Sequence, residues 1–340
     1  MKTLRTIIKE KIFDLREERN KEKKSFWCTE SESNQLEIYY KFKGIKPTNP
    51  MTPETQFGLN IRTKVEDVIL KYLDDILIEP LPYKDKDGKL IEKPEQHRVE
   101  MERFGVPITG YMDAIIAEVV EENNKKIIQV VPVEIKTSYG PYAQKELNMG
   151  QPKLGYIKQL AQYVDYVNEN INLYIPSIKK MFPNEKGEIK ICNKGYLFQL
   201  HFSNNGFIPE DFYQFIVSKN GNKIKCGQVE FDLVEDIYKR YERIWNDYIK
   251  PDIEPESDFP YKYSFDEIDW KNLSKAQITK ARNNIAVIGA WQPKYSNYKD
   301  LLITKEAKKL GKTFDEYIGY NDEELKKIKE LTTGYTTWKK

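Results

Sequence analysis

The stretch "VPVEIKTSYG", residues 131–140, has the apolar, β-branched character of a buried strand. Two charged side chains interrupt it, Glu134 and Lys136, which stand two residues apart. A buried charge is costly unless it is paired, so these two residues need an explanation. The sequence on either side of the stretch supplies one.

A β-hairpin is predicted around this stretch. Residues 107–120 and 125–137 are rich in Ile and Val, which are common in strands. Between them, Asn123 and Asn124 suit a tight two-residue turn. The two segments therefore predict an antiparallel pair joined at the asparagines.

The turn also fixes the expected register of the hairpin. If Glu122 pairs with Lys125, the same register places Asp113 opposite Glu134. Residues that stand opposite each other project to the same face, with Cβ atoms about 4.5–5.5 Å apart. Because strand side chains alternate, Lys136 lies on that face too.

Two carboxylates at that distance repel each other, so a divalent cation is the expected compensation. Oxygen ligands suit magnesium or manganese, which bind one or two carboxylates together with water and phosphate. A neighbouring lysine can orient the attacking water and offset charge that builds up on a phosphorus centre. Asp113, Glu134 and Lys136 are therefore the candidate catalytic residues of a phosphodiesterase site.

A simpler interpretation stands beside this one. On an edge strand, Glu134 and Lys136 would be ordinary solvated side chains. The pattern Glu-x-Lys also occurs in polar helical contexts, at Glu22–Lys24, Glu306–Lys308 and Glu324–Lys326. In a chain this rich in Glu and Lys the match is a matter of chance if Asp113 and Glu134 lie far apart.

Composition limits the classes of protein that need to be considered. The 340 residues carry 55 Lys and Arg against 53 Asp and Glu, so a nucleic-acid surface has to be local. The three cysteines form no pair or cluster with metal-ligand spacing. No signal-peptide core and no apolar run of about 20 residues is present. We expect a soluble, intracellular protein, cytoplasmic if it is bacterial or from a phage, with no membrane contact.

Helices and further strands are predicted on both sides of the hairpin. The expected helices are residues 3–24, 57–77 and 153–170, and further strands are expected at 194–202 and 212–217. Residues 79–96 read as an exposed loop and residues 250–260, with three prolines, as a linker. Three parts follow: an N-terminal helical segment at 1–50, a core at 51–250 and a helical C-terminal extension at 251–340.

The order of these motifs resembles that of a known family. Gly110-x-x-Asp113, then Glu134-Ile135-Lys136, then a helix that carries Gln159 and Tyr163, is similar to the PD-(D/E)XK nuclease superfamily, in its RecB-type exonuclease branch. The likeness covers about residues 55–205. It implies an α/β fold with a restriction-endonuclease-like core, in which helices flank a mixed central sheet. It also implies metal-dependent hydrolysis of DNA, with the Ile135 carbonyl as a metal ligand beside Asp113 and Glu134.

The helix at 153–170 shows two stripes on a helical projection. One is apolar and the other is mainly tyrosine, and Gln159 and Tyr163 share the second because they are four residues apart. A tyrosine stripe is commonly packing, but the resemblance implies that this pair lies beside the metal and binds DNA. The apolar stripe consists of Ile157, Leu160, Val164 and Val167.

The resemblance further implies a metal-assisting carboxylate on the helix before the hairpin. Glu66 is the best match, Asp67 is its nearest competitor, and Glu100 matches a secondary position. Many members have a histidine before this glutamate, often after a glycine, but Val65 and Arg62 occupy those places here. A carboxylate-only metal site is therefore expected.

No iron–sulfur cluster is expected. Cys28 lies where such members of the family have their first cysteine ligand, but no cysteine follows Cys226. Cys28 is therefore interpreted as a small buried residue.

Two questions about partners stay open. Lys153 and Lys158 on the helix, and residues 308–312, "KKLGK", are candidates for a local DNA path. The C-terminal extension is a candidate surface for a protein partner or for a homo-oligomer. The alternative function is a nuclease-fold module that binds DNA or protein without cleavage.

Overall fold

The computed structural model describes residues 23–85, 87–184, 187–191, 193–202, 209–287, 289 and 291–333. Contacts divide this chain into two units. The sheet unit comprises Lys24–Glu32 and Glu54–Asp247, and the helical unit comprises Ser33–Pro53 and the chain from Tyr248 onward. The helix expected at residues 3–24 lies almost wholly outside the described residues.

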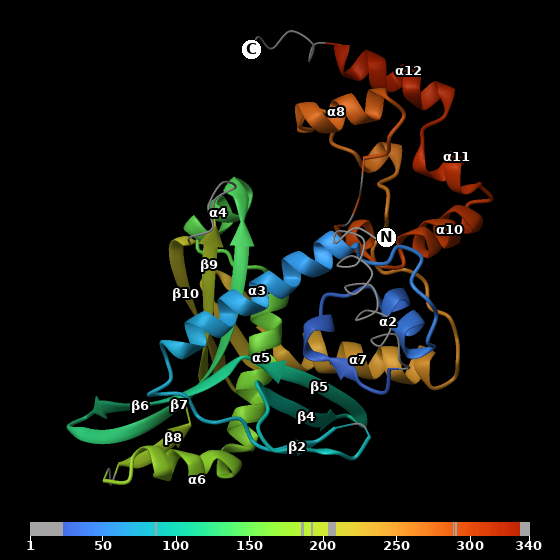
Figure 1. Cartoon of the computed structure of the whole chain (residues 1–340). Helices are drawn as coiled ribbons and strands as arrows, with labels where there is room; N and C mark the ends of the chain where they lie inside the picture. The colour runs from blue at the N-terminus through green and yellow to red at the C-terminus, as the bar shows by residue number, and fades with distance from the viewer. Residues whose placement is uncertain are drawn as a thin grey trace, which may run out of the picture. The chain divides into compact units, whose positions relative to one another are not determined.

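A mixed sheet forms the centre of the sheet unit (Figure 1). Its described strands run in the order β12-β11-β10-β9-β7-β6, and β8 also pairs with β7. The β6–β7 and β9–β10 pairs are antiparallel, whereas β7–β9 is parallel. The strands are β6 (Ala114–Glu122), β7 (Lys125–Tyr139), β8 (Glu188–Ile191), β9 (Lys194–Phe202), β10 (Pro209–Asn220), β11 (Lys223–Cys226) and β12 (Val229–Asp232).

The hairpin and its register are confirmed. Asn123 and Asn124 both have positive φ angles, 54° and 60°, as a type I′ turn requires. Glu122 pairs with Lys125, and the ladder continues without a shift to Ala114 and Val133. Extending this register by one pair places Asp113 beside Glu134, which is the neighbourhood that the sequence predicted.

The strand expected at residues 107–120 is in fact two strands, and this is a correction. β5 (Val106–Met112) belongs to a smaller sheet with β1 (Phe26–Trp27) and β4 (His97–Arg103), whereas β6 belongs to the main sheet. The break falls at Asp113, whose side chain accepts a hydrogen bond from the backbone N–H of Ile135. The Ile135 N–H thus donates to the Asp113 side chain. In an uninterrupted strand it would have donated to a backbone carbonyl group of that strand.

One helix covers each face of β7. On one face, Val65, Ile69 and Leu70 of α3 (Pro53–Lys71) pack against a core that includes Ile135. On the other face, α5 (Leu154–Glu169) contacts β7 and β9. The predicted apolar stripe of α5 is fully buried or nearly so. The other helices of the sheet unit are α4 (Gly140–Asn148), α6 (Ile171–Met181) and α7 (Lys239–Ile244).

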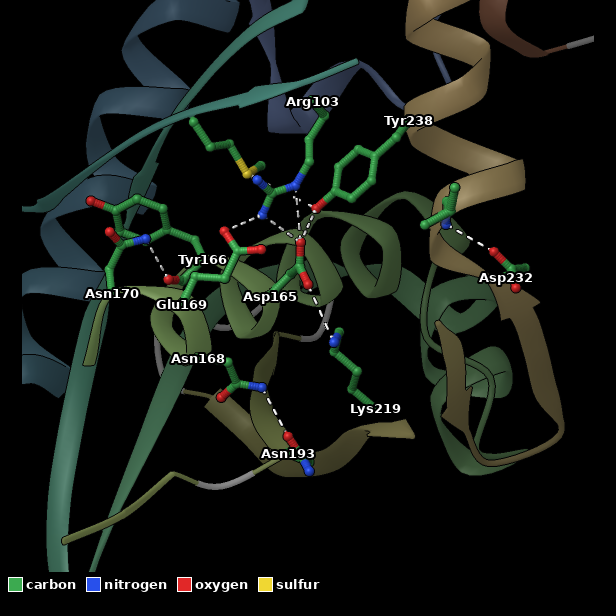
Figure 2. A network of polar contacts seen from close by, with 12 residues as sticks. Arg103, Asp165, Tyr166, Asn168, Glu169, Asn170, Asn193, Lys219, Asp232 and Tyr238 are labelled. Carbon is green, nitrogen blue, oxygen red and sulfur yellow. Dashed lines mark hydrogen bonds and ion pairs between the residues drawn. The ribbon is translucent and has the colours of Figure 1, made fainter. Parts of the chain in front are cut away.

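A polar network anchors the C-terminal half of α5 (Figure 2). Asp165 accepts hydrogen bonds from Arg103 and Tyr238, both at 2.8 Å, and lies 3.3 Å from the Lys219 ammonium group. Arg103 comes from β4, Lys219 from β10 and Tyr238 from the π-helical turn Val234–Tyr238. These contacts fix the helix that carries Gln159 and Tyr163.

The helical unit contains the segment that was expected to be a linker. Residues 250–260 lack regular structure but are bound to α2 (Gln35–Phe42). Tyr39 and Tyr40 donate hydrogen bonds to Asp252 and Glu254, each at 2.9 Å. The segment is therefore an ordered part of this unit. Its other helices are α8 (Lys275–Arg282), α9 (Trp291–Tyr295), α10 (Lys299–Lys309), α11 (Phe314–Ile318) and α12 (Asp322–Leu331).

The expected loop at residues 79–96 contains a short hairpin, β2 (Tyr83–Lys84) with β3 (Leu90–Ile91). Across the described parts of the chain, every helix is too short or too polar to span a lipid bilayer.

Candidate active site

The candidate site lies where β7 extends past its partner β6. The β6 ladder ends at Ala114 and Val133, whereas β7 continues to Tyr139, paired over this part with β9 among the described strands. On the edge of β7 that β6 no longer covers, the Ile135 N–H donates to Asp113 Oδ2 at 2.8 Å. The N–H and C=O groups of one strand residue face the same edge, so the Ile135 carbonyl group also faces the Asp113 side.

Asp113 is buried and held from two directions. Its Oδ1 atom accepts a hydrogen bond from Gln96 Nε2 at 2.8 Å, and Ile135 occupies the other oxygen. Burial raises the pKa of Asp113, and the nearby positive charge of Lys136 opposes that rise. Sequence reasoning missed Gln96, because a single glutamine in a polar stretch carries no distinguishing signal.

Glu134 is fully buried, and its two oxygens are in different situations. Oε1 accepts hydrogen bonds from Gln159 Nε2, at 2.7 Å, and from the Lys136 ammonium group. Oε2 is buried and has no hydrogen-bond partner among the described residues. Burial, and then the negative charge of Asp113, raise the pKa of Glu134 to about 8.

Lys136 completes the group. Its burial opposes the positive charge, but the negative charges of Glu134 and Asp113 outweigh this and raise the pKa of Lys136. The side chain is therefore a stable cation on the face of β7 that also carries Glu134. The interpretation of Glu134 and Lys136 as two solvated residues on an edge strand is wrong, since the glutamate is buried and the lysine is bonded to it.

A short relay connects Glu134 to the backbone of β5. Gln159 Nε2 also donates to the Tyr163 hydroxyl at 3.0 Å, and that hydroxyl donates to the Tyr111 carbonyl at 2.8 Å. Both side chains are buried, and Tyr163 is only 1% exposed. In this structure they hold Glu134 in place, while the DNA contact expected of them stays a prediction.

Close packing explains the glycine of the Gly-x-x-Asp motif. A Cβ atom at Gly110 would lie 2.9 Å from Cys28 Sγ and 3.1 Å from the Tyr163 hydroxyl. A larger residue would therefore displace the tyrosine that supports Gln159. Cys28 is buried, as predicted.

Glu66 lies on the α3 side of the site. Val65 and Ile69 pack against the core. Glu66, which follows Val65 on the same helix, is half-buried. Burial, followed by the negative charge of Asp113, raises the pKa of Glu66 to about 7. The competitor Asp67 instead pairs with Lys64 at 2.7 Å.

Two further expectations can be placed. Glu100 is exposed on β4 and pairs with Arg98. Lys158 is only 9% exposed and pairs with Glu32, so its place on an exposed DNA path is wrong. Lys153, by contrast, is exposed.

The donors available to a metal are two carboxylates and a carbonyl group. No group of three or more His, Cys, Asp and Glu side chains in the described ranges is placed to hold a metal ion by itself. Asp113, Glu134 and the Ile135 carbonyl group offer hard oxygen ligands, and magnesium commonly completes such a set with water and substrate phosphate. Glu66 is not part of this donor set, but its negative charge acts on Asp113 and Glu134.

Comparison with known proteins gives little. No family model matches the chain, and no curated protein matches it. One solved structure, titled "Crystal structure of SSO0001", is similar over 72% of this chain and 86% of its own, with 14% identity and a TM-score of 0.36. So distant a likeness carries no argument about fold or function.

Proposed function

We propose that this chain is a magnesium- or manganese-dependent deoxyribonuclease with a restriction-endonuclease-like core, similar to the RecB-type exonucleases of the PD-(D/E)XK superfamily. The observation that carries the proposal is the buried Oε2 atom of Glu134, which has no partner in the described chain and lies beside a second buried carboxylate. Buried polar atoms in native proteins nearly always have a partner. A cation is the partner that suits two adjacent carboxylates.

The residues present fit a divalent cation. Asp113, Glu134 and the Ile135 carbonyl would hold it, and Glu66 would assist. When bound, the metal supplies Lewis-acid stabilisation of the phosphate and lowers the pKa of an attacking water. Two protein carboxylates and one carbonyl group leave room for the water and phosphate that magnesium prefers.

The protein's own groups take the other roles. Lys136 places a positive charge next to Glu134, where it orients the water and offsets negative charge that develops on the phosphate. Gln159 keeps Oε1 of Glu134 occupied, so that Oε2 would be available to a metal ion. With its pKa near 7, Glu66 can accept a proton close to neutral pH.

DNA as substrate rests on the motif order Gly110-x-x-Asp113, Glu134-Ile135-Lys136 and Gln159-x-x-x-Tyr163, which resembles the RecB-type branch. We infer an intracellular enzyme that acts on DNA. The helical unit remains a candidate surface for a protein partner or a second copy of the chain.

Cleavage of labelled DNA tests the proposal. End-labelled single- and double-stranded linear DNA and closed circular DNA are incubated with wild type in magnesium, manganese or EDTA. Asp113→Ala and Lys136→Ala are compared with Asp67→Ala, which removes an acidic residue of α3 that pairs only with Lys64 in the described structure. Metal-dependent loss of linear DNA that the first two variants abolish and the third retains is expected.

A different result would favour the alternative. If wild type leaves every DNA whole in both metals but retards it on a gel, the chain is a binding module on a nuclease fold. Circular dichroism of each variant separates loss of activity from loss of folding.

A further inference from the structure

Arg62 lies on α3, one turn before Glu66. Its guanidinium group sits over the ring of Tyr139, with its central carbon 4.9 Å from the ring centroid. Tyr139 ends β7 three residues after Lys136, is 40% exposed and stacks on Phe202. An aromatic ring that stacks on a second ring in this way restrains a cation at the C-terminal end of β7.

Lys153 has a matching position on the other helix. It immediately precedes α5, and its ammonium group lies 5.7 Å from the centroid of the Tyr156 ring. The ammonium of Lys136 lies 5.6 Å from the same centroid. Tyr156 comes one turn before Gln159, so this cation also stands next to the site.

Unlike the neighbouring cations, Arg62 and Lys153 form no direct ion pair with a carboxylate among the described residues, although the charge of Arg62 acts to lower the pKa of Glu66. Lys136 is bonded to Glu134, Lys158 to Glu32 and Lys64 to Asp67. Within the described residues no ion pair involves Arg62 or Lys153. Each of the two helices beside the carboxylates thus offers one aromatic-supported cation that is available to an anion.

We propose that Arg62 and Lys153 bind two backbone phosphates of the substrate strand, one on each side of the phosphate at the carboxylates. The inference rests on the proposed nuclease function and adds the path of the nucleic acid. The DNA strand crosses the end of β7 from α3 to α5. Phosphate contacts fix the register of a nucleic acid without reading its sequence, so binding at these residues is independent of sequence. Tyr139 and Tyr156 are positioning residues, since they act through the cations.

The salt dependence of DNA binding tests this inference. Affinities of the full-length protein for labelled single-stranded and duplex DNA are measured by fluorescence anisotropy in EDTA, between ~50 and ~200 mM salt. Losing one phosphate contact lowers the slope of log K against log salt by about 0.7 for a single strand and 0.9 for a duplex. Arg62→Ala and Lys153→Ala should each show this loss, and the double variant should show the sum because the two contacts are separate.

Controls come from the same elements. Lys64→Ala removes an exposed lysine from α3 that is already paired with Asp67, and it should keep the wild-type slope. Tyr139→Phe retains the ring and should bind as wild type, whereas Tyr139→Leu should weaken binding without removing the charge. In magnesium, Arg62→Ala should raise KM more than it lowers kcat.

The outcomes separate this inference from the nuclease proposal. Wild-type slopes in both Arg62→Ala and Lys153→Ala, or an equal loss in Lys64→Ala, would overturn the inference even if wild type cuts DNA. Reduced slopes in an enzyme that cuts nothing in any metal would support the phosphate contacts and reject the nuclease. Absence of DNA binding by folded wild type at low salt would overturn the inference.

Discussion

The Gln159 amide nitrogen lies 2.7 Å from Glu134 Oε1, although 25 residues separate the two in sequence. The same nitrogen lies 3.0 Å from the Tyr163 hydroxyl, so a buried relay links the strand acid to the helix. This relationship explains why a glutamine and a tyrosine stand four residues apart on α5. They hold Oε1 of Glu134 and leave Oε2 without a hydrogen-bond partner among the described residues.

Removal of the amide should weaken catalysis and leave the fold intact. In Gln159→Ala, Oε1 keeps only Lys136, so Glu134 is held less firmly and kcat should fall about tenfold or more. The two hydrogen bonds that the amide loses, one of them to a buried carboxylate, should together cost about 1–3 kcal/mol of folding free energy. Steady-state cleavage in magnesium and urea unfolding measure the two effects. Unchanged kcat would show that the relay does not position the acid.

A methyl group at Gly110 should disturb the same relay by crowding. Gly110→Ala introduces a Cβ atom 2.9 Å from Cys28 Sγ and should destabilise the protein by about 1–3 kcal/mol. Cys28→Ala removes the sulfur, so the double variant should recover part of that loss. A double-mutant cycle of unfolding free energies measures the coupling. Strict additivity would contradict the packing explanation.

Stability in EDTA should fall as pH rises above neutrality. Folding raises the pKa of Glu134 to about 8, so the native state keeps a proton that the unfolded chain has released. The resulting stabilisation is complete below the unfolded pKa of about 4.3 and is lost as pH rises through 8. Between pH 6.5 and 8 the free energy of unfolding should drop by about 2 kcal/mol.

His97 makes only a small contribution in this pH window, and in the opposite direction. Burial lowers the pKa of His97 from 6.5 to about 4, so the residue is mostly neutral in both states above pH 6.5. Urea unfolding at a series of pH values checks the slope. Glu134→Gln should reduce the slope, and the remainder belongs to Glu66, whose pKa of about 7 lies in the same window. Stability that rises across this window in wild type would contradict the assigned burial of the acid.

The Asp165 network should contribute stability without chemistry. Asp165→Asn leaves Arg103 and Lys219 near a neutral group in a largely buried setting, which should cost roughly 3 kcal/mol. The network lies on the same helix as Gln159 but contacts none of the proposed catalytic residues. Cleavage at low temperature should therefore fall, but only modestly. Thermal melting and cleavage below the transition measure the two effects. A melting temperature equal to that of wild type would show that the network is not a clamp.

The hairpin was predictable because its determinants are local. A two-asparagine turn sets the register of β6 and β7, and that register brought Asp113 beside Glu134 from sequence alone. The apolar stripe of α5 could likewise be predicted from the sequence, since helical periodicity depends only on neighbouring turns.

The features that were missed depend on distant contacts. The division at Asp113 follows from a side-chain bond to Ile135, which strand propensity does not reveal. The hydrogen bond from Gln96 to Asp113 joins residues that are separated in sequence, and so does the ion pair of Lys158 with Glu32. Residues 250–260 looked like a linker from their prolines, but their contacts with α2 make them part of the helical unit.

Anomalous diffraction from crystals soaked in manganese tests the central claim most directly. A peak bounded by Asp113, Glu134 and the Ile135 carbonyl group in wild type, and absent in Glu134→Gln, is the predicted result. A wild-type protein that cleaves DNA in manganese but shows its only manganese peak elsewhere would contradict the assignment of this site.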